Sequence, residues 1–421
     1  MIAQNQQGSP ARTQVAAGIL STVLAVSLVI ATLCASLIFL AYYYRLSTVQ
    51  HTVERRLSNN AQSGIHLLLA ATDQQSFPTA HPVDLFGKGQ DSVWLQQKPW
   101  GLYQVAMAKA RVGERSKEMI ALTGHYPSEL GKAALYLSDE QRPLSIAGNT
   151  YLNGTCYLPR AGIKSAYVNR VGYQGKQLIN GSTLESKSTL PPLSAEALTH
   201  FRMLLAAEPQ DYQWLASLPD SLIHSFADAS LYHHRPSSII LKGTLQGNII
   251  VASDQQITLT AQSHLDGIIV TAPRIVMEPG FTGRVQALAT DTLLVSPNCH
   301  LRYPSTLLLL SARGAVHLEE DSRVEGTVVI TGEEADYHWR LLQIEEGATV
   351  AGMVYTDGLV ALKGSIHGHL SCRKFLLRTP STLYENHILD GTIDPSRRSP
   401  YFLASSLWAV SNQKGIVQWL Y

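Results

Sequence analysis

The chain has 421 residues, enough for two or three domains with a core each, and a net charge of +1. Charged residues make up 15% of the sequence, so no strongly basic face is implied and nucleic acid is a poor partner. The four cysteines form no CxxC pair, which excludes a zinc pattern or a disulfide framework. Cys34 lies in an apolar segment, and Cys156, Cys299 and Cys372 are predicted to be buried free thiols.

The first predicted element is an apolar helix. Residues 15–40 contain no charged side chain, and a membrane-spanning helix needs about 20 apolar residues. The run is longer than the core of a cleaved signal peptide, and it leads into Tyr42, Tyr43 and Tyr44, which suit a membrane interface. The sequence therefore predicts a single-pass membrane protein with a short N-terminal tail, residues 1–14.

Two opposing signals bear on the orientation of this helix. Arg12 precedes it and Arg45, Arg55 and Arg56 follow it, which by the positive-inside rule places the C-terminal part in the cytoplasm. An uncleaved anchor ahead of a large globular portion commonly delivers that portion outward. We expect the second outcome, with the C-terminal bulk extracytoplasmic, in the periplasm.

The helical pattern continues beyond the apolar segment. Small or apolar residues recur at spacings of three and four, which is the spacing of one helix face: Leu46, Val49, Val53, Leu57, Ala61, Gly64, Ile65 and Leu68. One helix is predicted over residues 15–72, about 85 Å long. Three alternating runs follow, at 102–112, 117–126 and 133–139, and predict an antiparallel sheet in a small α+β region, residues 73–143.

A long N-terminal helix, apolar first and amphipathic later, ahead of an antiparallel sheet resembles the type IV pilin-like and pseudopilin-like class. The resemblance covers residues 15–140 and implies an assembly role. The cleavable Gly-Phe-Thr signal of that class and the glutamate at the fifth helix position are absent from this sequence. A plain anchor helix with a small α+β domain therefore remains the alternative.

The second half of the chain is a repeat. An apolar residue, a spacer and a glycine recur at intervals of 16–26 residues, with one longer gap of 43: Leu245/Gly247, Leu265/Gly267, Phe281/Gly283, Val324/Gly326, Val350/Gly352, Ile366/Gly368 and Leu389/Gly391. Apolar bursts such as 249–251 and 257–259 lie between them in a constant order. A period near 20 residues built of short strands predicts a parallel β-solenoid rather than an antiparallel sandwich.

The predicted fold is therefore mainly β. We expect first β-helix rungs at 144–192, a helical insertion at 193–235, a main β-helix at 236–391 and an aromatic C-terminal cap at 392–421. Residues 144–391 resemble right-handed β-helix proteins of the polymer-forming, bactofilin-like kind, and more loosely the carbohydrate-active β-helices. The resemblance rests on periodicity, so it implies a fold rather than an activity.

No residues are predicted to be catalytic, cofactor-binding or metal-binding. Five aspartates fall at different phases of the repeat, which indicates that most are turn residues instead of stacked carboxylates: Asp254, Asp266, Asp291, Asp321 and Asp357. His367 and His369 are expected to straddle a corner without a third ligand, and His233 and His234 to form a solvated boundary. The sequence contains no phosphate-binding loop and no nucleophile elbow.

The function predicted from these features is a non-enzymatic, membrane-anchored structural or assembly protein of the cell envelope, pilin-like and secretion-associated, without cofactors. Its expected partners are the membrane, other envelope or pilus-like assembly proteins and further copies of itself. Two alternatives remain open, a module that binds envelope glycan and a carbohydrate-active enzyme. The aromatic residues are too scattered to form the row that glycan binding would favour: Tyr303, Tyr337, Trp339 and Tyr355.

Overall fold

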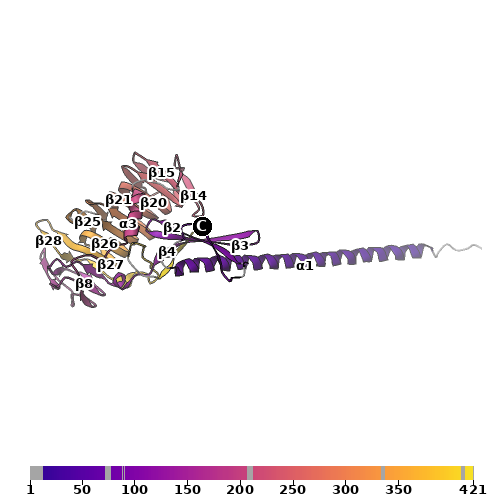
Figure 1. Ribbon diagram of the computed structural model, residues 1–421, viewed down its shortest axis with the longest axis horizontal. Coiled ribbons are helices and arrows are strands. Elements are labelled where there is room, and N and C mark those ends of the chain that lie inside the picture. Colours follow the sequence, from indigo (N-terminus) through magenta and orange to yellow (C-terminus); the bar gives the residue numbers. More distant parts are fainter. Residues whose placement is uncertain are drawn as a thin grey trace, which may run out of the picture.

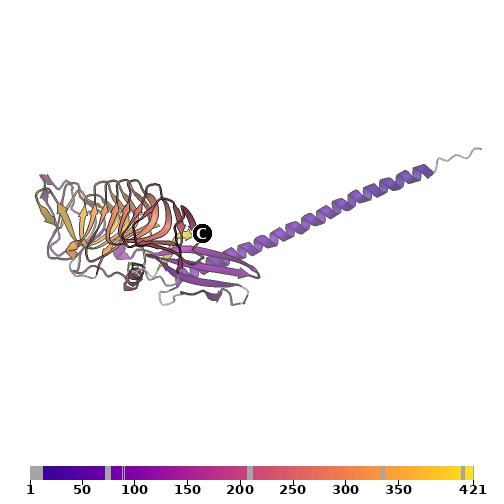
Figure 2. The same ribbon diagram turned by 90° about the horizontal axis from the view of Figure 1, so that it is seen from above.

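The computed structural model describes residues 13–71, 77–87, 89, 91–205, 212–332, 337–408 and 413–420. Figure 1 shows a head made of strands at one end of a long helix, and Figure 2 shows the same arrangement from above. The helix is α1 (Thr13–Ala70), 58 residues and about 87 Å long. It confirms the prediction of one helix that runs past the apolar segment, whereas the predicted tail, 1–14, lies almost entirely outside the described residues.

Five antiparallel strands form a sheet at the C-terminal end of α1, in the order β1-β2-β3-β4-β31. Their bounds are β1 (His81–Asp84), β2 (Ser92–Trp100), β3 (Tyr103–Val112), β4 (Arg115–His125) and β31 (Lys414–Leu420). The last strand of the chain therefore returns to the first sheet, and it does not cap the solenoid as predicted for 392–421. It covers the edge of β4, which would otherwise present unpaired backbone groups.

The last turns of α1 pack on one face of this sheet. The buried apolar or small residues of the helix are Leu57, Ala61, Gly64, Ile65 and Leu68, and Asn60 is buried beside them. They contact a sheet face made of small and aliphatic side chains, Val93, Leu95, Ala106, Ala108, Ala110 and Ala121. The approach is close, because a Cβ added to Gly64 would lie 2.8 Å from the Ala108 Cβ.

Between β4 and β31 the chain forms a parallel β-solenoid of about 11 turns, which confirms the interpretation of the repeat. Six long strands run along more than one wall: β20 (His264–Met277), β21 (Thr282–Val295), β22 (His300–Leu310), β24 (Arg323–Thr331), β26 (Thr349–Leu362) and β27 (Ser365–Arg378). Shorter strands complete three walls. The first wall adds β14 (Ser221–His224), β17 (Thr244–Gly247), β30 (Thr392–Ile393) and β7 (Tyr151–Leu152).

The second wall adds strands at both ends of the long ones: β13 (Gln213–Trp214), β15 (Leu231–Arg235), β18 (Ile249–Ser253), β5 (Leu135–Leu137), β8 (Cys156–Leu158) and β12 (Thr183–Glu185). The third wall adds β16 (Ile239–Leu241), β19 (Gln256–Leu259), β23 (Gly314–Leu318), β25 (Arg340–Ile344), β29 (His387–Leu389), β6 (Leu144–Ala147) and β9 (Ile163–Ser165). Smaller elements are α2 (Glu129–Lys132), the hairpin β10 (Tyr167–Val168) and β11 (Val171–Gly172), β28 (Leu383–Glu385), and two 3-10 helices, η1 (Tyr337–Trp339) and η2 (Pro395–Arg397).

Inward side chains stack in columns along the solenoid, as the apolar bursts predict. One column on the second wall runs without a break through Val251, Val270, Ala287, Leu307, Val328, Val354, Leu370 and Leu135. Every one of these side chains is buried. Burying one aliphatic side chain contributes about 1.5–3 kcal/mol, so the columns supply the main stabilisation of the stack.

The early rungs extend the far end of the main stack and do not precede it, contrary to the order predicted from the sequence. β5 pairs with β27 on one side and with β8 on the other, while β7 pairs with β30 and β6 with β29. One turn is therefore assembled from two distant parts of the chain, 387–393 and 135–137. The run at 133–139, expected as a third strand of the α+β sheet, belongs to this turn, because parallel stacking requires matching columns and not sequence order.

The helical insertion predicted at 193–235 contains one helix within the described residues, α3 (Ala195–Leu205). The part from 213 to 235 forms β13, β14 and β15, which are the first turns of the stack. α3 lies across the outer face of the second wall, where Phe201 and Leu204 are buried. The wall residues in this cluster are apolar although they point outward: Tyr232, Ile250, Ile269, Leu288, Leu308, Val329 and Tyr355.

Candidate functional site

A buried glutamine fastens the sheet to the solenoid. Gln286 on the second wall is 4% exposed, accepts a hydrogen bond from Leu102 N at 2.7 Å and donates one to Trp100 O at 3.1 Å. The Trp100 indole donates to Gly267 O at 3.0 Å, and its ring meets Phe226 edge-on with 5.2 Å between centroids. Since buried polar groups are costly unless they are hydrogen-bonded, these bonds fix the orientation of the solenoid on the sheet.

The outer face of the first wall carries charges, and acids on it are paired. Arg284 Nε lies 2.8 Å from Asp266 Oδ1, and Arg323 Nε lies 2.7 Å from Glu325 Oε1. Burial raises the pKa of Glu325, but the hydrogen bond with His300 at 3.3 Å and the charge of Arg323 outweigh it and leave that pKa lowered. Glu325 therefore stays ionised, and the contacts of Asp266 with Arg284 and of Glu325 with His300 connect adjacent turns.

A second charged cluster lies between the second and third walls. Asp357 forms an ion pair with Arg340, 1% exposed, at 3.4 Å and another with Arg373. Lys374 Nζ lies 2.8 Å from Glu140 Oε2, in the loop that follows β5. Partly buried charges need partners to offset their desolvation. The cluster therefore connects the early rungs to β27, next to the turn assembled from 135–137 and 387–393, which we call the composite turn.

The five aspartates considered from the sequence do not converge. Asp254 and Asp321 lie in turns, whereas Asp266, Asp291 and Asp357 lie inside β20, β21 and β26, so the turn prediction is wrong for these three. Three of them pair with an arginine: Asp266 with Arg284, Asp291 with Arg274 and Asp357 with Arg340. Asp254 lies 2.8 Å from His234 Nε2. Within the described ranges no group of three His, Cys, Asp or Glu side chains is placed to hold a metal ion.

The two histidines expected at a corner lie within β27 instead. His369 is fully buried, with Nδ1 at 2.9 Å from Ala133 O and Nε2 at 2.7 Å from Ser371 Oγ. Burial lowers the pKa of His369 to about 4, so the ring is neutral at pH 7. It holds the segment that enters the composite turn. His367 lies two residues earlier on the same face of the strand and is half-buried.

The predicted free thiols are confirmed. Cys156, Cys299 and Cys372 are buried and unpaired. Burial raises the pKa of Cys156 to about 12, which leaves this thiol protonated and unreactive. His233 was expected on a solvated boundary, but it is buried. Its Nδ1 lies 2.8 Å from the carbonyl oxygen of Leu215, which directly follows β13, the strand that pairs with β15.

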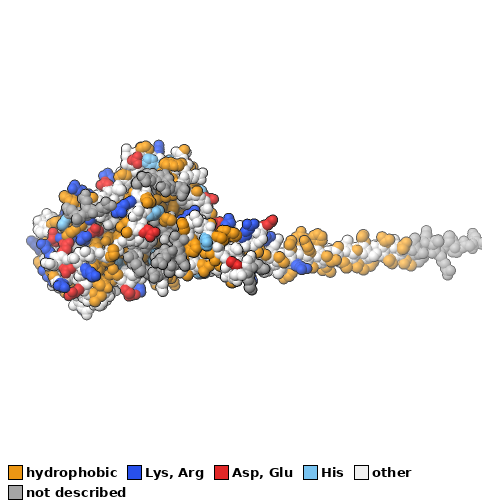
Figure 3. Space-filling view, in the orientation of Figure 1, with side chains coloured by type: hydrophobic (Ala, Val, Ile, Leu, Met, Phe, Trp, Pro, Cys, Tyr) orange, Lys and Arg blue, Asp and Glu red, His pale blue; other side chains and the backbone are white. Residues whose placement is uncertain are grey.

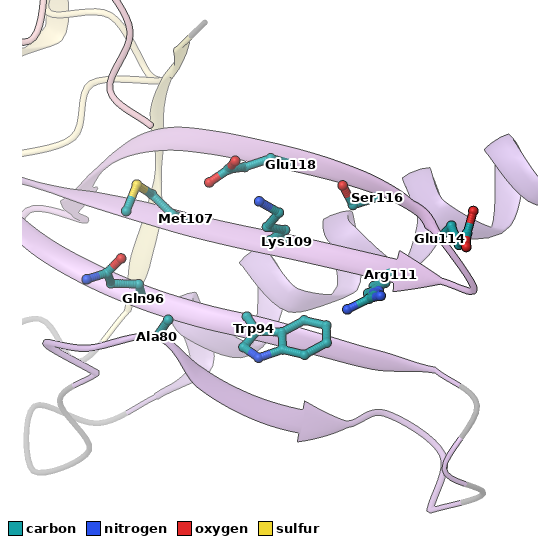
Figure 4. Close-up of a pocket in the computed structure, with 9 residues that line it drawn as sticks. All are labelled: Ala80, Trp94, Gln96, Met107, Lys109, Arg111, Glu114, Ser116 and Glu118. Atoms are coloured by element: carbon teal, nitrogen blue, oxygen red, sulfur yellow. The ribbon is translucent and has the colours of Figure 1, made fainter. Parts of the chain in front are cut away.

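The sheet face turned away from α1 carries a groove of about 370 Å³. Figure 4 shows Trp94, Met107, Lys109, Arg111 and Glu118 along it. Trp94, Lys109 and Glu118 are direct cross-strand neighbours on β2, β3 and β4. The groove offers an aromatic ring among charges of both signs, which suits a partner of mixed polarity.

Sequence reasoning overlooked the covered outer face of the second wall, although the signal was present. Bursts of three consecutive apolar residues, such as 249–251, 268–270 and 307–309, place one apolar side chain outside the solenoid because strand residues alternate. The aromatic residues judged too scattered are indeed separated, and Tyr355 is buried beside Trp408 with 5.8 Å between ring centroids.

No protein-family model matches this chain, and neither a curated protein nor a solved structure matches it. The likeness to pilin-like and bactofilin-like proteins therefore stands on the arrangement of the elements alone.

Proposed function

We propose that the protein is a membrane-anchored, non-enzymatic assembly component of the cell envelope, in which α1 is both anchor and spine and the solenoid is the presented head. The observation that carries the proposal is the continuity of α1. By length and composition α1 can cross a membrane, and its last turns are the core of the head's sheet. In Figure 3 the helix outside the head is covered mainly by hydrophobic side chains.

The connection between spine and head is built for rigidity. Arg56 Nη2 and Asn60 Nδ2 donate to the two oxygens of Asp91, at 2.6 and 2.7 Å. The hydrogen bond from Arg56 lowers the pKa of Asp91, so the carboxylate stays charged across the physiological range. A flexible linker would isolate the head from movements of the anchor, whereas a continuous helix transmits them.

Between the aromatic cluster at 42–44 and the first buried helix residue, Leu57, lies a neck of helix with an apolar stripe. Leu46 and Val49 in this neck are 41% and 54% exposed, and no other part of the described chain covers them. The stripe is in line with the face that packs on the sheet. We propose that the neck packs against neighbouring subunits or partner helices when the protein assembles.

Cysteine cross-linking in membranes tests the assembly role. In a Cys34→Ala background, Val49→Cys is expected to form cross-linked species, because the stripe faces a neighbouring helix. Gln50→Cys, one residue along and turned by about 100°, is the matched control and is expected to react far less. Monomer alone at Leu46→Cys and Val49→Cys, at native expression, would contradict an assembly role for α1.

The absence of an enzymatic activity is part of the proposal. It is supported by the ion pairs of Asp266, Asp357 and Glu325 with arginines. The pKa of Glu325 is lowered, whereas a general acid needs a raised pKa. Hydrolysis or cleavage of an acidic or neutral polysaccharide by the purified chain, abolished by substitution of one of its carboxylates, would overturn this part of the proposal.

A further inference from the structure

The solenoid has one end that faces away from the membrane helix. Its last turns follow β8 and contain β9, the hairpin β10–β11 and β12. We call this part, residues 159–190, the tip. Figure 1 places β8 at the end of the head opposite α1, and Figure 2 shows the same separation. β12 pairs with β8 on one side, and its residues Thr183, Leu184 and Glu185 are all exposed. The tip is therefore the part of the head that lies farthest from α1, and it is exposed to molecules on that side.

Charge is segregated at the tip. Residues 159–190 hold five cations and one acid, a net +4, although the whole chain carries only +1. The cations are all exposed: Arg160, Lys164, Arg170, Lys176 and Lys187. The single acid, Glu185, lies 3.6 Å from Arg160, and the nearest acid of the preceding rung, Asp139, accepts from the backbone amides of Gln141 and Arg160.

Several cations on the walls of the solenoid are paired with acids. On its walls Arg284, Arg323, Lys363 and Arg373 are each within ion-pair distance of an acid, at 2.8 Å or less. Such pairs leave little net field. At the tip several unpaired cations act together, and their field attracts polyanions at low ionic strength.

The tip also has a hollow with hydrogen-bonding and aromatic walls. It measures about 630 Å³ and is lined by Ser165, Tyr167, Tyr173 and Lys176 among others. Tyr167 is 72% exposed, the largest aromatic surface in the hollow. Gln174 and Gln177, next in sequence to the lining residues Tyr173 and Lys176, are exposed. An open, polar hollow with one flat ring suits a hydroxyl-rich chain better than an apolar one.

The other end of the solenoid has the opposite charge and is partly occupied. Its described turns, residues 212–234, contain two acids, Asp220 and Asp228, and no Lys or Arg. Phe226 from its first turn packs on Trp100 of the sheet hairpin, which covers part of that end. A second copy stacked end to end would have to displace this contact, so the charge of the tip is better suited to a foreign polyanion.

From the exposed cations, the hollow and Tyr167, we propose that the tip binds an acidic polysaccharide, a hydroxyl-rich chain bearing carboxylate groups. Lys164, Arg170 and Lys176 contact the anionic groups, and Tyr167 stacks on a sugar ring. The inference extends the proposed function by naming a ligand class for the head. It depends on that function only for the placement of the head outside the cytoplasm.

Binding is measured with the full-length protein in nanodiscs of uncharged lipid, using polygalacturonate as the probe and dextran as the neutral control. We expect binding to polygalacturonate that weakens on the order of tenfold between about 50 and about 500 mM NaCl, and none to dextran. The triple variant K164E/R170E/K176E is expected to bind on the order of tenfold or more weakly. The matched control K98E/R115E/K242E makes the same charge change at exposed sites outside the tip, and is expected to lose less than about threefold.

Four results would overturn the proposal. Equal losses in the two triple variants would show a non-specific effect of net charge. Unchanged polygalacturonate binding in K164E/R170E/K176E, with new aggregates, would show that the cations only protect an open sheet edge. Equal affinity for poly-L-glutamate, insensitive to Tyr167→Ala, would indicate an acidic polypeptide. Oligomers that dissociate only in the tip variant would indicate a second copy. None of these measurements depends on cross-linking through α1, so either proposal can fail alone.

Discussion

Replacing Gln286 by leucine tests whether the sheet and the solenoid are one rigid head. The substitution keeps the volume but removes the partners of Leu102 N and Trp100 O, which lie 2.7 and 3.1 Å from the glutamine amide. An unsatisfied buried polar group costs about 1–3 kcal/mol, so the two together cost about 2–6 kcal/mol. We expect this cost to weaken the packing of the β2–β3 turn on the solenoid, while the columns inside the solenoid stay as stable as before.

Hydrogen exchange at the β2–β3 turn measures that cost. A loss of about 2–6 kcal/mol accelerates exchange of the Leu102 amide by about 30- to 20,000-fold. Gln246→Leu, an exposed glutamine on β17, is the matched control and is expected to change exchange by less than about threefold. Wild-type exchange at Leu102 in Gln286→Leu would refute the reasoning, because the hairpin would then be held by its apolar contacts alone.

Three further predictions follow from single residues. Gly326 has φ +143°, and a Cβ added to it would lie 2.0 Å from Ser305 O. Gly326→Ala is therefore expected to lower the free energy of unfolding by about 3 kcal/mol or more in chemical unfolding, against about 1–2 kcal/mol for Gly280→Ala at an open turn. Equal costs for the two variants would contradict the steric argument. The pKa of His369 is depressed to about 4 in the folded protein, so its contribution to stability is present above the unfolded pKa near 6.5 and is lost as pH falls toward 4. His369→Gln is therefore expected to flatten the decrease in Tm between about pH 6.5 and about pH 4. An unchanged slope of Tm against pH would assign the acid sensitivity to other groups. The double change L28R/L33R adds about 5–7 kcal/mol to insertion and is expected to release the protein from membranes in alkaline extraction, whereas T52R in the neck is not; retention of the double variant would exclude α1 as the anchor.

The sequence was informative where one physical pattern dominates. The apolar run and the spacing of Leu57, Ala61, Ile65 and Leu68 predicted α1 through to the sheet, since a helix face repeats every three to four residues. The period near 20 residues predicted the solenoid and the columns of its core. Both patterns are local, so they can be recognised without knowing which distant segments meet.

The parts that were not predicted depend on long-range pairing. Nothing local in 135–137 shows that these residues stack on β27, and nothing local in 414–420 shows that they pair with β4. The tip was not recognised either. The excess of cations in 159–190 is visible in the sequence, but nothing local shows that this stretch forms the terminal turns of the solenoid.

The turn made from 135–137 and 387–393 also determines when the protein can fold during its synthesis. The early rungs expose their apolar columns until residues about 240 positions later have been made and form the surface on which they stack. At about 5–20 residues per second this interval is roughly 12–48 s. During that time the segment is available to chaperones and compatible with export as an unfolded chain, and the head closes only after its last strands arrive.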